Sequence, residues 1–310
     1  MLANIRTRIY ILIEDDTNLR NMITQKFSKT LSLLLIGTLA LAMTTTVSAE
    51  IVNPAEKYDG EPLQLITFFL FFVGYISMGA AFVFFMAERN NVAPEYRTTM
   101  TISALIVGIA AFHYYYMRGV YVELGDVSIE YRYMDWIITV PLMALKFPSL
   151  VGKDAITDEK FLGMGFTGVC FTGALIMIGF GYLGEAGVLG GIMGESLGGI
   201  AGLVLGGVGW AMIIVATGTP WSSGKGVDNS KIAPELMWSA NALRWFIVVG
   251  WIIYPFGYLF SPQAGLVDSA SAAEVMAVLY NIADMINKIG FGVVAWMGAK
   301  KATEALASKA

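Results

Sequence analysis

Long apolar stretches alternate with short polar connections along most of this chain of 310 residues. The apolar stretches cover residues 63–87, 98–117, 131–147, 161–184, 197–217, 236–260 and 272–299. A helix needs about 20 apolar residues to cross the roughly 30 Å of hydrocarbon in a bilayer, and only the third stretch is shorter. Because an open sheet cannot span lipid, each stretch predicts a helix. The pattern therefore predicts an all-α membrane protein with a bundle of seven transmembrane helices.

The residues before the first stretch have the composition of a secretory signal peptide. Two lysines precede an apolar run at residues 31–43, and a small-residue sequence, Val-Ser-Ala, ends at Ala49. This order is typical of a segment that is cleaved, and the run is short for an eighth membrane helix. Met22 offers a second start. We therefore expect an N-terminal extension with a cleavable signal peptide over residues 1–49 and a seven-helix domain over residues 50–310.

The polar connections differ in charge between the two sides of the predicted bundle. Basic residues occupy the first, third and fifth connections and the end of the chain, namely Arg89, Arg97, Lys153, Lys160, Lys225, Lys231, Lys300 and Lys301. Acidic residues occupy the other connections, namely Glu123, Asp126, Glu130, Glu185, Glu195 and Asp268. Since lysine and arginine are enriched on the cytoplasmic side of membrane proteins, we expect a periplasmic N-terminus and a cytoplasmic C-terminus.

The composition agrees with a membrane protein and argues against several kinds of binding site. Hydrophobic residues make up 56% of the chain and charged residues 14%, whereas soluble domains carry about 25% charged residues. The net charge of -4 and the lack of a basic run argue against a nucleic-acid partner. The single cysteine, Cys170, cannot form an internal disulfide, and the single histidine, His113, cannot build a multi-histidine metal centre.

Two charged residues lie in the middle of the seventh stretch. Asp284 and Lys288 are four residues apart, so they share one face of a helix, and the lysine is too deep to reach water easily. One interpretation is an ion pair that holds helices together. The other is that the amine is used chemically, because a lysine removed from water loses its proton more readily and then attacks a carbonyl.

The third stretch carries a row of polar residues. Arg132, Asp135 and Thr139 follow i, i+3, i+7 spacing and therefore share a helix face. Lys146 lies about 16 Å beyond Asp135 along the axis and about 20° from the same face. Such rows inside a membrane bundle are typical of ion or proton routes. Alternatively, Lys146 is a lysine near a helix end that extends to the membrane surface.

Two sequence motifs carry a resemblance to a known family. "RYMDWIITVPL" at residues 132–142 and "YNIADMINKIGFG" at residues 280–292 resemble microbial rhodopsins, in particular the proteorhodopsins of bacteria. "HYYYMRGVYVELGD", "GYLGEAG" and "GWIIYPFGY" resemble proteorhodopsin segments in the same order. The similarity covers all seven predicted helices. It implies a location in the bacterial inner membrane and assembly into pentamers or hexamers.

The resemblance assigns roles to the charged residues. Lys288 would bind all-trans retinal as a protonated Schiff base, with Asp135 as counterion and proton acceptor and Asp284 as second counterion. Arg132 would lie just outside them, and His113 would partner Asp135. The three-residue signature of the third helix would be Asp135, Thr139 and Lys146.

The resemblance also implies a binding pocket for the polyene. Its walls would be Trp136, Met143, Met177, Gly181, Trp210, Trp251, Tyr254, Pro255 and Tyr258. Met143 stands where an apolar residue implies green rather than blue absorption. Leu203, beside Gly202, occupies the position of a glycine that admits a carotenoid antenna in some relatives, which argues against an antenna here.

One position departs from the usual family pattern. Lys146 replaces the carboxylic acid that returns a proton to the Schiff base from the cytoplasm, although some bacterial pumps of the family carry lysine there. Either Lys146 donates that proton or water carries it. The carboxylate at Asp135 argues against a chloride pump, and neither neighbour in the signature matches a sodium pump.

The sequence therefore favours a light-driven transporter, not an enzyme, that moves protons from cytoplasm to periplasm. A photosensory rhodopsin that signals to a partner protein would retain the same lysine and aspartates and is the main alternative. A seven-helix transporter without a pigment is a third.

Overall fold

The computed structural model describes residues 53–264, 266, 267, 269 and 271–308. The predicted signal peptide and N-terminal extension lie outside these residues, as does Asp268. Seven helices are long and apolar enough to cross a membrane, in agreement with the predicted fold class. They span Pro62–Asn91, Pro94–Leu124, Ile129–Val151, Phe166–Glu185, Glu195–Thr217, Pro234–Tyr258 and Ala272–Ala307.

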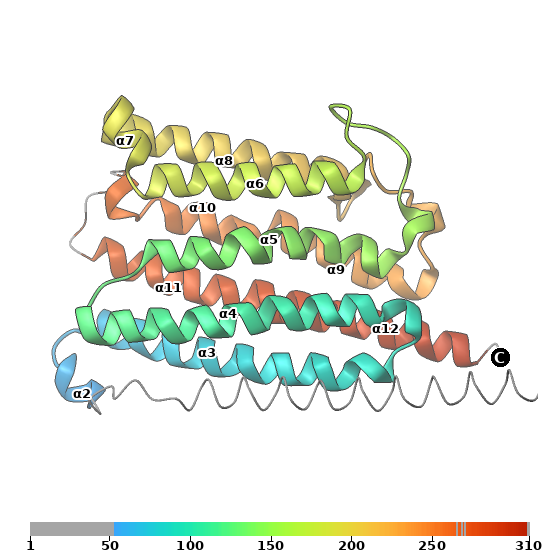
Figure 1. Cartoon of the computed structure of the whole chain (residues 1–310), viewed down its shortest axis with the longest axis horizontal. Coiled ribbons are helices and arrows are strands. Elements are labelled where there is room, and N and C mark those ends of the chain that lie inside the picture. The colour runs from blue at the N-terminus through green and yellow to red at the C-terminus, as the bar shows by residue number, and fades with distance from the viewer. Residues whose placement is uncertain (1–52, 265, 268, 270, 309–310) are drawn as a thin grey trace, which may run out of the picture. The chain divides into compact units, whose positions relative to one another are not determined.

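The long helices lie side by side, as Figure 1 shows. The first three are α3 (Pro62–Glu88, continued by η1, Arg89–Asn91), α4 (Arg97–Leu124, preceded by η2, Pro94–Tyr96) and α5 (Ile129–Val151). The fourth and fifth are α6 (Phe166–Glu185) and α8 (Glu195–Thr217). The sixth consists of α9 (Pro234–Val248), η5 (Gly250–Ile252) and α10 (Ile253–Tyr258), and the seventh of α11 (Ala272–Asp284), η7 (Met285–Gly290) and α12 (Phe291–Ala307). Helix α5 packs between α4 and α6, and α12 packs against α9.

Short elements occupy the connections. These are α2 (Pro54–Lys57), η3 (Lys153–Ala155), α7 (Val188–Met193), η4 (Asn229–Lys231) and η6 (Pro262–Ala264), with a two-stranded antiparallel hairpin of β1 (Gly218–Thr219) and β2 (Ser222–Ser223). Strand β1 follows the end of α8 directly, so this hairpin lies in the connection to α9.

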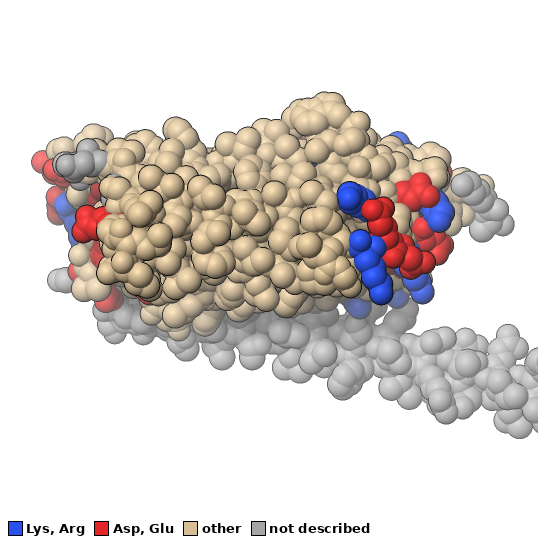
Figure 2. All heavy atoms as spheres, turned by 90° about the horizontal axis from the view of Figure 1, so that it is seen from above, with Lys and Arg blue, Asp and Glu red and all other residues tan. Residues whose placement is uncertain are grey.

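The outer surface of the bundle is apolar. In the face that Figure 2 shows, charged side chains gather at the two ends and a broad band without charge separates them. Large apolar side chains are exposed on the long helices, among them Phe69, Ile76, Ile138, Val204 and Phe256. Water would disfavour so many exposed apolar groups, whereas lipid does not. The chain is a multi-pass membrane protein.

Three helix boundaries differ from the predicted ones by five residues or more. The second helix runs on to Leu124, and the fourth begins only at Phe166, because Leu162 and Gly163 adopt positive φ angles of 54° and 78° in a tight turn. The last helix continues to Ala307, since its end is rich in alanine, lysine and glutamate, which favour helix even outside the hydrocarbon.

The last helix also contains a wide turn. Residues Met285–Gly290 form a π-helix, in which each backbone hydrogen bond spans one residue more than in an α-helix. The sequence predicts a uniform helix here. Lys288 lies inside the wide turn, and isolated π turns occur often at functional sites.

Candidate functional site

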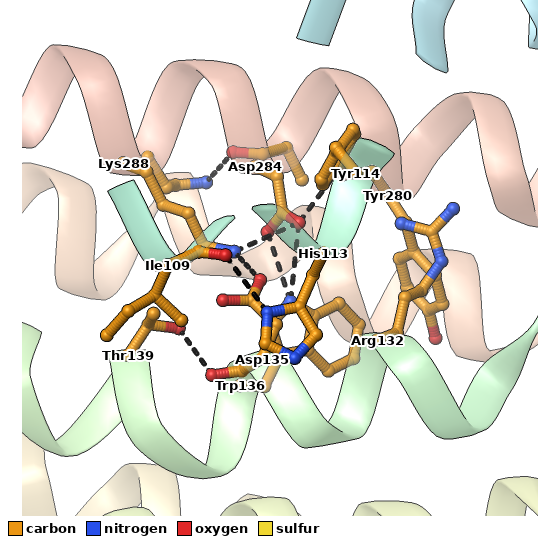
Figure 3. A network of polar contacts seen from close by, with 12 residues as sticks. Ile109, His113, Tyr114, Arg132, Asp135, Trp136, Thr139, Tyr280, Asp284 and Lys288 are labelled. Atoms are coloured by element: carbon orange, nitrogen blue, oxygen red, sulfur yellow. Dashed lines mark hydrogen bonds and ion pairs between the residues drawn. The ribbon is translucent and has the colours of Figure 1, made fainter. Parts of the chain in front are cut away.

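The structure brings Lys288 together with two carboxyl groups inside the bundle. The Lys288 Nζ contacts Asp135 Oδ2 in an ion pair and lies 3.1 Å from Asp284 Oδ2 (Figure 3). All three side chains are buried. Burying charges is unfavourable unless they are paired, and here one amine faces two carboxylates. This cluster, which we call the Lys288 cluster, joins the two motifs of the third and seventh helices.

The two carboxyl groups have different surroundings. Asp284 accepts hydrogen bonds from Tyr114 Oη at 2.9 Å, Trp136 Nε1 at 3.1 Å and Tyr254 Oη at 2.9 Å. Asp135 Oδ1 accepts none from the residues that the structure describes. Hydrogen bonds donated to a carboxylate stabilise its ionised form. Asp135 therefore depends on Lys288 for its stabilisation far more than Asp284 does, and loss of the lysine charge would favour protonation of Asp135.

Arg132 lies near the cluster, at the beginning of α5. Its Nη2 donates to Asn281 Oδ1 at 2.9 Å, and its guanidinium lies 5.3 Å from the ring centroid of Tyr280. The Nε and Nη1 atoms have no hydrogen-bond partner among the described residues. The arginine is buried and forms none of the ion pairs found in this part of the chain. Its guanidinium instead lies against aromatic rings and donates a hydrogen bond to an amide oxygen.

Thr139 and His113 flank Asp135 without bonding to its carboxyl group. The Thr139 hydroxyl donates to the backbone oxygen of Asp135 at 3.0 Å, which fixes the hydroxyl on its own helix. His113 Nδ1 lies 2.9 Å from the backbone oxygen of Ile109, one turn earlier on α4. The half-buried imidazole lies near the Asp135 side chain in Figure 3. The structure thus places both residues near the acid, and their roles in its chemistry stay predictions.

A largely apolar cavity begins at Lys288. The space inside it, counted together with its opening, is about 770 Å³. Every residue predicted for the pocket lines it: Trp136, Met143, Met177, Gly181, Trp210, Trp251, Tyr254, Pro255 and Tyr258. A long apolar molecule with an aldehyde group fits these walls, because the aldehyde would meet a buried primary amine.

Sequence reasoning missed about half of the lining. The further residues are Tyr133, Val140, Ile178, Gly202, Leu203, Gly206, Gly207 and Tyr280. Tyr133 and Val140 share a helix face with Trp136 and Met143, so helical spacing could have found them. Gly202 and Gly206 lie where α8 comes close to α6: a side chain on Gly202 would meet the Gly184 Cα at 2.6 Å.

Lys146 is fully buried, which contradicts the alternative of a lysine extended to the membrane surface. Its Nζ has no hydrogen-bond partner among the described residues and lies 4.8 Å from the ring centroid of Phe291, one turn beyond Lys288. The reason is the length of α5, which continues to Val151 and so leaves Lys146 inside the bundle. The row of polar residues along α5 is therefore internal from Arg132 to Lys146.

Glu185 was expected in a connection between helices, and that expectation is wrong. It is the last residue of α6 and is fully buried. Tyr133 Oη donates to its Oε2 at 2.6 Å and Tyr280 Oη at 3.1 Å. Both tyrosines come from other helices, α5 and α11, so the pattern of α6 alone could not reveal the burial.

Comparisons with known proteins identify relatives over most of the chain. Residues 65–302 match the model of a family described as bacteriorhodopsin-like protein. The green-light absorbing proteorhodopsin of Gamma-proteobacterium EBAC31A08 is 34% identical over 273 residues, 87% of this chain and 98% of the relative. The crystal structure of Exiguobacterium sibiricum rhodopsin superposes with a TM-score of 0.64 and 32% identity, covering 78% of this chain and 99% of that one. Xanthorhodopsin, a light-driven ion pump with dual chromophore, gives a TM-score of 0.65 and 26% identity, covering 80% and 97%.

Proposed function

Because this chain belongs to the bacteriorhodopsin-like protein family, we propose that it is a light-driven proton pump that binds retinal on Lys288 and moves protons out of the cell. The contact between the Lys288 amine and Asp135, at one end of an apolar cavity, is the observation that carries this proposal. Membership of this family supports the expected activity of a transporter, not that of an enzyme.

The residues around the cavity fit retinal. Lys288 would hold it covalently through Nζ, and the aromatic walls, among them Trp136, Trp251 and Tyr254, would enclose its chain. When bound, retinal supplies the absorption of visible light and a change of shape that alters the surroundings of the lysine nitrogen. The apolar Met143 in the wall, buried to 2% exposure, supports green absorption.

Asp135 is the proton acceptor in this proposal. The proton leaves Lys288 Nζ and binds to a carboxylate oxygen of Asp135, which neutralises both charges at once. Asp284 keeps its negative charge because three donors hold it, and it therefore preserves one anion in the cluster after the transfer. The unequal partners of the two acids support this assignment.

The direction of transport follows from the two ends of α5. Arg132 lies on the side where the connections are acidic, and Lys146 lies toward the side where they are basic. Basic connections indicate the cytoplasm, which makes the Arg132 side periplasmic in the inner membrane. Lys146 would return a proton to Lys288 from the cytoplasmic side. Its burial without a hydrogen-bond partner among the described residues supports a role in proton transfer, because the contact with the Phe291 ring leaves the hydrogen-bond donors of the amine unsatisfied.

Two further features of the proposal come from the resemblance. A second copy of the chain is expected as partner in a pentamer or hexamer, and a carotenoid antenna is not expected. Leu203 supports the latter, since a leucine lines the cavity where a glycine would leave room.

Light-dependent acidification tests the function. Bacterial cells that express the full chain and receive all-trans retinal should become coloured, and illumination should acidify the medium until an uncoupler is added. Lys288→Ala should abolish both effects. Coloured cells that do not acidify the medium would indicate a photosensor instead, and colourless protein would exclude retinal binding.

A further inference from the structure

Arg118 is a charged residue of α4 that has no part in the proton path described above. Its guanidinium lies over three aromatic rings, 4.5 Å from the ring centroid of Tyr115, 4.8 Å from that of Phe72 and 5.6 Å from that of Tyr75. Two of these rings belong to α3, so the arginine lies where the first two long helices pack together. We call Arg118 and the three rings the Arg118 cage.

No anion balances the charge of Arg118 in the part of the chain that the structure describes. The half-buried side chain forms no ion pair or hydrogen bond with any described residue. By contrast, Arg132 donates to Asn281 and Arg244 to Asn241. Aromatic faces attract a cation, but they provide no oxygen acceptor for the N–H groups of a guanidinium. The donors of Arg118 are therefore free to bind a group from outside the described chain.

The position of Arg118 along α4 places it at the depth of one leaflet of the membrane. Helix α4 has 28 residues, so it is about 42 Å long and exceeds the roughly 30 Å of hydrocarbon by about 6 Å at each end. Arg118 comes six residues before Leu124, the last residue of α4, so its Cα lies about 9 Å from that end. Its guanidinium leans back over the Tyr115 ring, deeper still. Because hydrocarbon does not solvate a charge, an arginine at this depth attracts water and lipid headgroups.

A second copy of the chain offers no matching carboxylate at this depth. The acidic residues inside the described spans, Asp135, Asp284 and Glu185, are all buried. The exposed acidic residues of the described spans lie within about one turn of a helix end. Near the cage, α3 and α4 instead expose apolar side chains such as Phe69 and Phe112. The surface that adjoins Arg118 is thus suited to lipid tails, and the missing anion to a lipid headgroup.

We propose that the Arg118 cage is a binding site for the phosphate of a phospholipid in the periplasmic leaflet. Two N–H groups of the guanidinium donate to two phosphate oxygens, in the paired geometry that arginine forms with phosphate. The rings of Tyr115, Phe72 and Tyr75 hold the guanidinium on the protein side and leave its other donors toward lipid.

The charge of the site selects the class of lipid. Phosphatidylglycerol carries one net negative charge, whereas phosphatidylcholine brings a cation of its own beside the phosphate. Since no described carboxylate is paired with Arg118, the lipid with a net negative charge binds more tightly. The site requires neither light nor pigment, so it stands or falls independently of the proposed pump.

Lipid retention by the purified full chain tests the inference. We expect native mass spectra of the wild type, purified in mild detergent from bacterial membranes, to show a bound phospholipid. Arg118→Gln should retain about tenfold less, because it loses charge-assisted hydrogen bonds. Lys231→Gln is the control and should retain the lipid, since Lys231 already pairs with Asp228 at 3.8 Å. Equal retention in Arg118→Gln and the wild type would overturn the inference.

A variant of the cage separates binding from a purely structural role of the arginine. Tyr115→Leu keeps the charge and removes the nearest ring, so it should retain severalfold less lipid than the wild type. Arg118→Lys keeps the charge without the paired geometry and should fall between the wild type and Arg118→Gln. If Arg118→Gln does not fold, these two variants decide, and wild-type retention in both would overturn the inference.

Thermal unfolding in lipid nanodiscs, followed by tryptophan fluorescence, identifies the source of the phosphate. Replacing part of the phosphatidylcholine with phosphatidylglycerol should raise the unfolding temperature of the wild type and of Lys231→Gln, but not that of Arg118→Gln. Inorganic phosphate added to discs of phosphatidylcholine alone should have no effect. An equal rise with inorganic phosphate would indicate a site for free anions and overturn the assignment to lipid, as would an equal rise with phosphatidylglycerol in Arg118→Gln.

Discussion

Asn287 donates a hydrogen bond from its side-chain amide to the backbone oxygen of Gly250, 3.0 Å away. Asn287 precedes Lys288 in the π-helix, and Gly250 begins the 3₁₀ turn η5 that interrupts the sixth long helix. The next residue, Trp251, lines the cavity. The bond therefore ties the helix that carries the lysine to the break in the neighbouring helix.

This contact leaves no room for a side chain at position 250. A Cβ on Gly250 would overlap Asn287 Oδ1, so we expect Gly250→Ala to lower the free energy of unfolding. Asn287→Ala should lower the free energy of unfolding by about 1 kcal/mol, because the partly buried hydrogen bond to the Gly250 oxygen is lost. Thermal loss of colour measures both effects. Gly179→Ala is the control, since no atom of the described residues lies within 4 Å of the position that its new Cβ would take. An equal loss of stability in this variant would contradict the steric argument.

Asp135→Asn should abolish proton transfer while leaving the fold intact. An amide can neither balance the lysine charge nor accept its proton, so we expect the light-driven pH change to fall by about two orders of magnitude or more. Flash absorption and external pH measure the two steps. Asp126→Asn, in an exposed connection, should pump as the wild type does, and pumping by Asp135→Asn would refute the assignment of the acceptor.

Lys146→Met should make the protein more stable and proton transport slower. The buried amine has no hydrogen-bond partner among the described residues, and an apolar side chain of similar length should stabilise the protein by about 1 kcal/mol or more. The same change should slow the return of the proton to Lys288 by about tenfold or more, because the chain loses the buried donor.

Time-resolved absorption after a flash measures the proton's return in this variant. Lys153→Ala, on the exposed turn η3, serves as control. An unchanged photocycle in Lys146→Met would remove the lysine from the mechanism and leave water as the carrier.

Met143→Gln should shift the absorption of the pigment toward blue. Met143 is buried and lines the cavity, so an amide there would place a dipole against the bound chromophore. An absorption spectrum of purified protein is sufficient. Met134→Gln, on the exposed face of α5, is the control, and its absorption spectrum should match that of the wild type. An equal shift in both variants would contradict a direct effect of residue 143 on the chromophore.

The spans and the charged cluster could be predicted because each depends on local spacing. Asp135 and Lys288 stand out as charges within apolar stretches, and this signal does not require knowledge of neighbouring helices. The cavity walls needed the family resemblance, since an aromatic residue on a membrane helix is more often only packing.

Glu185 and Asn287 could not be found in this way. Glu185 follows two glycines in "GYLGEAG", which indicates the end of a helix in the sequence, and its burial is caused by tyrosines from α5 and α11. Asn287 is an ordinary polar residue until the break at Gly250 supplies an acceptor on another helix. Both roles depend on how helices pack, which a single sequence does not contain.

The wide turn at Met285–Gly290 sets a limit on how the chain can change in length. Losing one residue there would close the turn into an ordinary α-helix and rotate everything beyond it by about 100°. Either Lys288 would turn away from the cavity, or α12 would lose its packing against α9. Insertions and deletions should therefore be tolerated in the connecting loops and rejected at this turn.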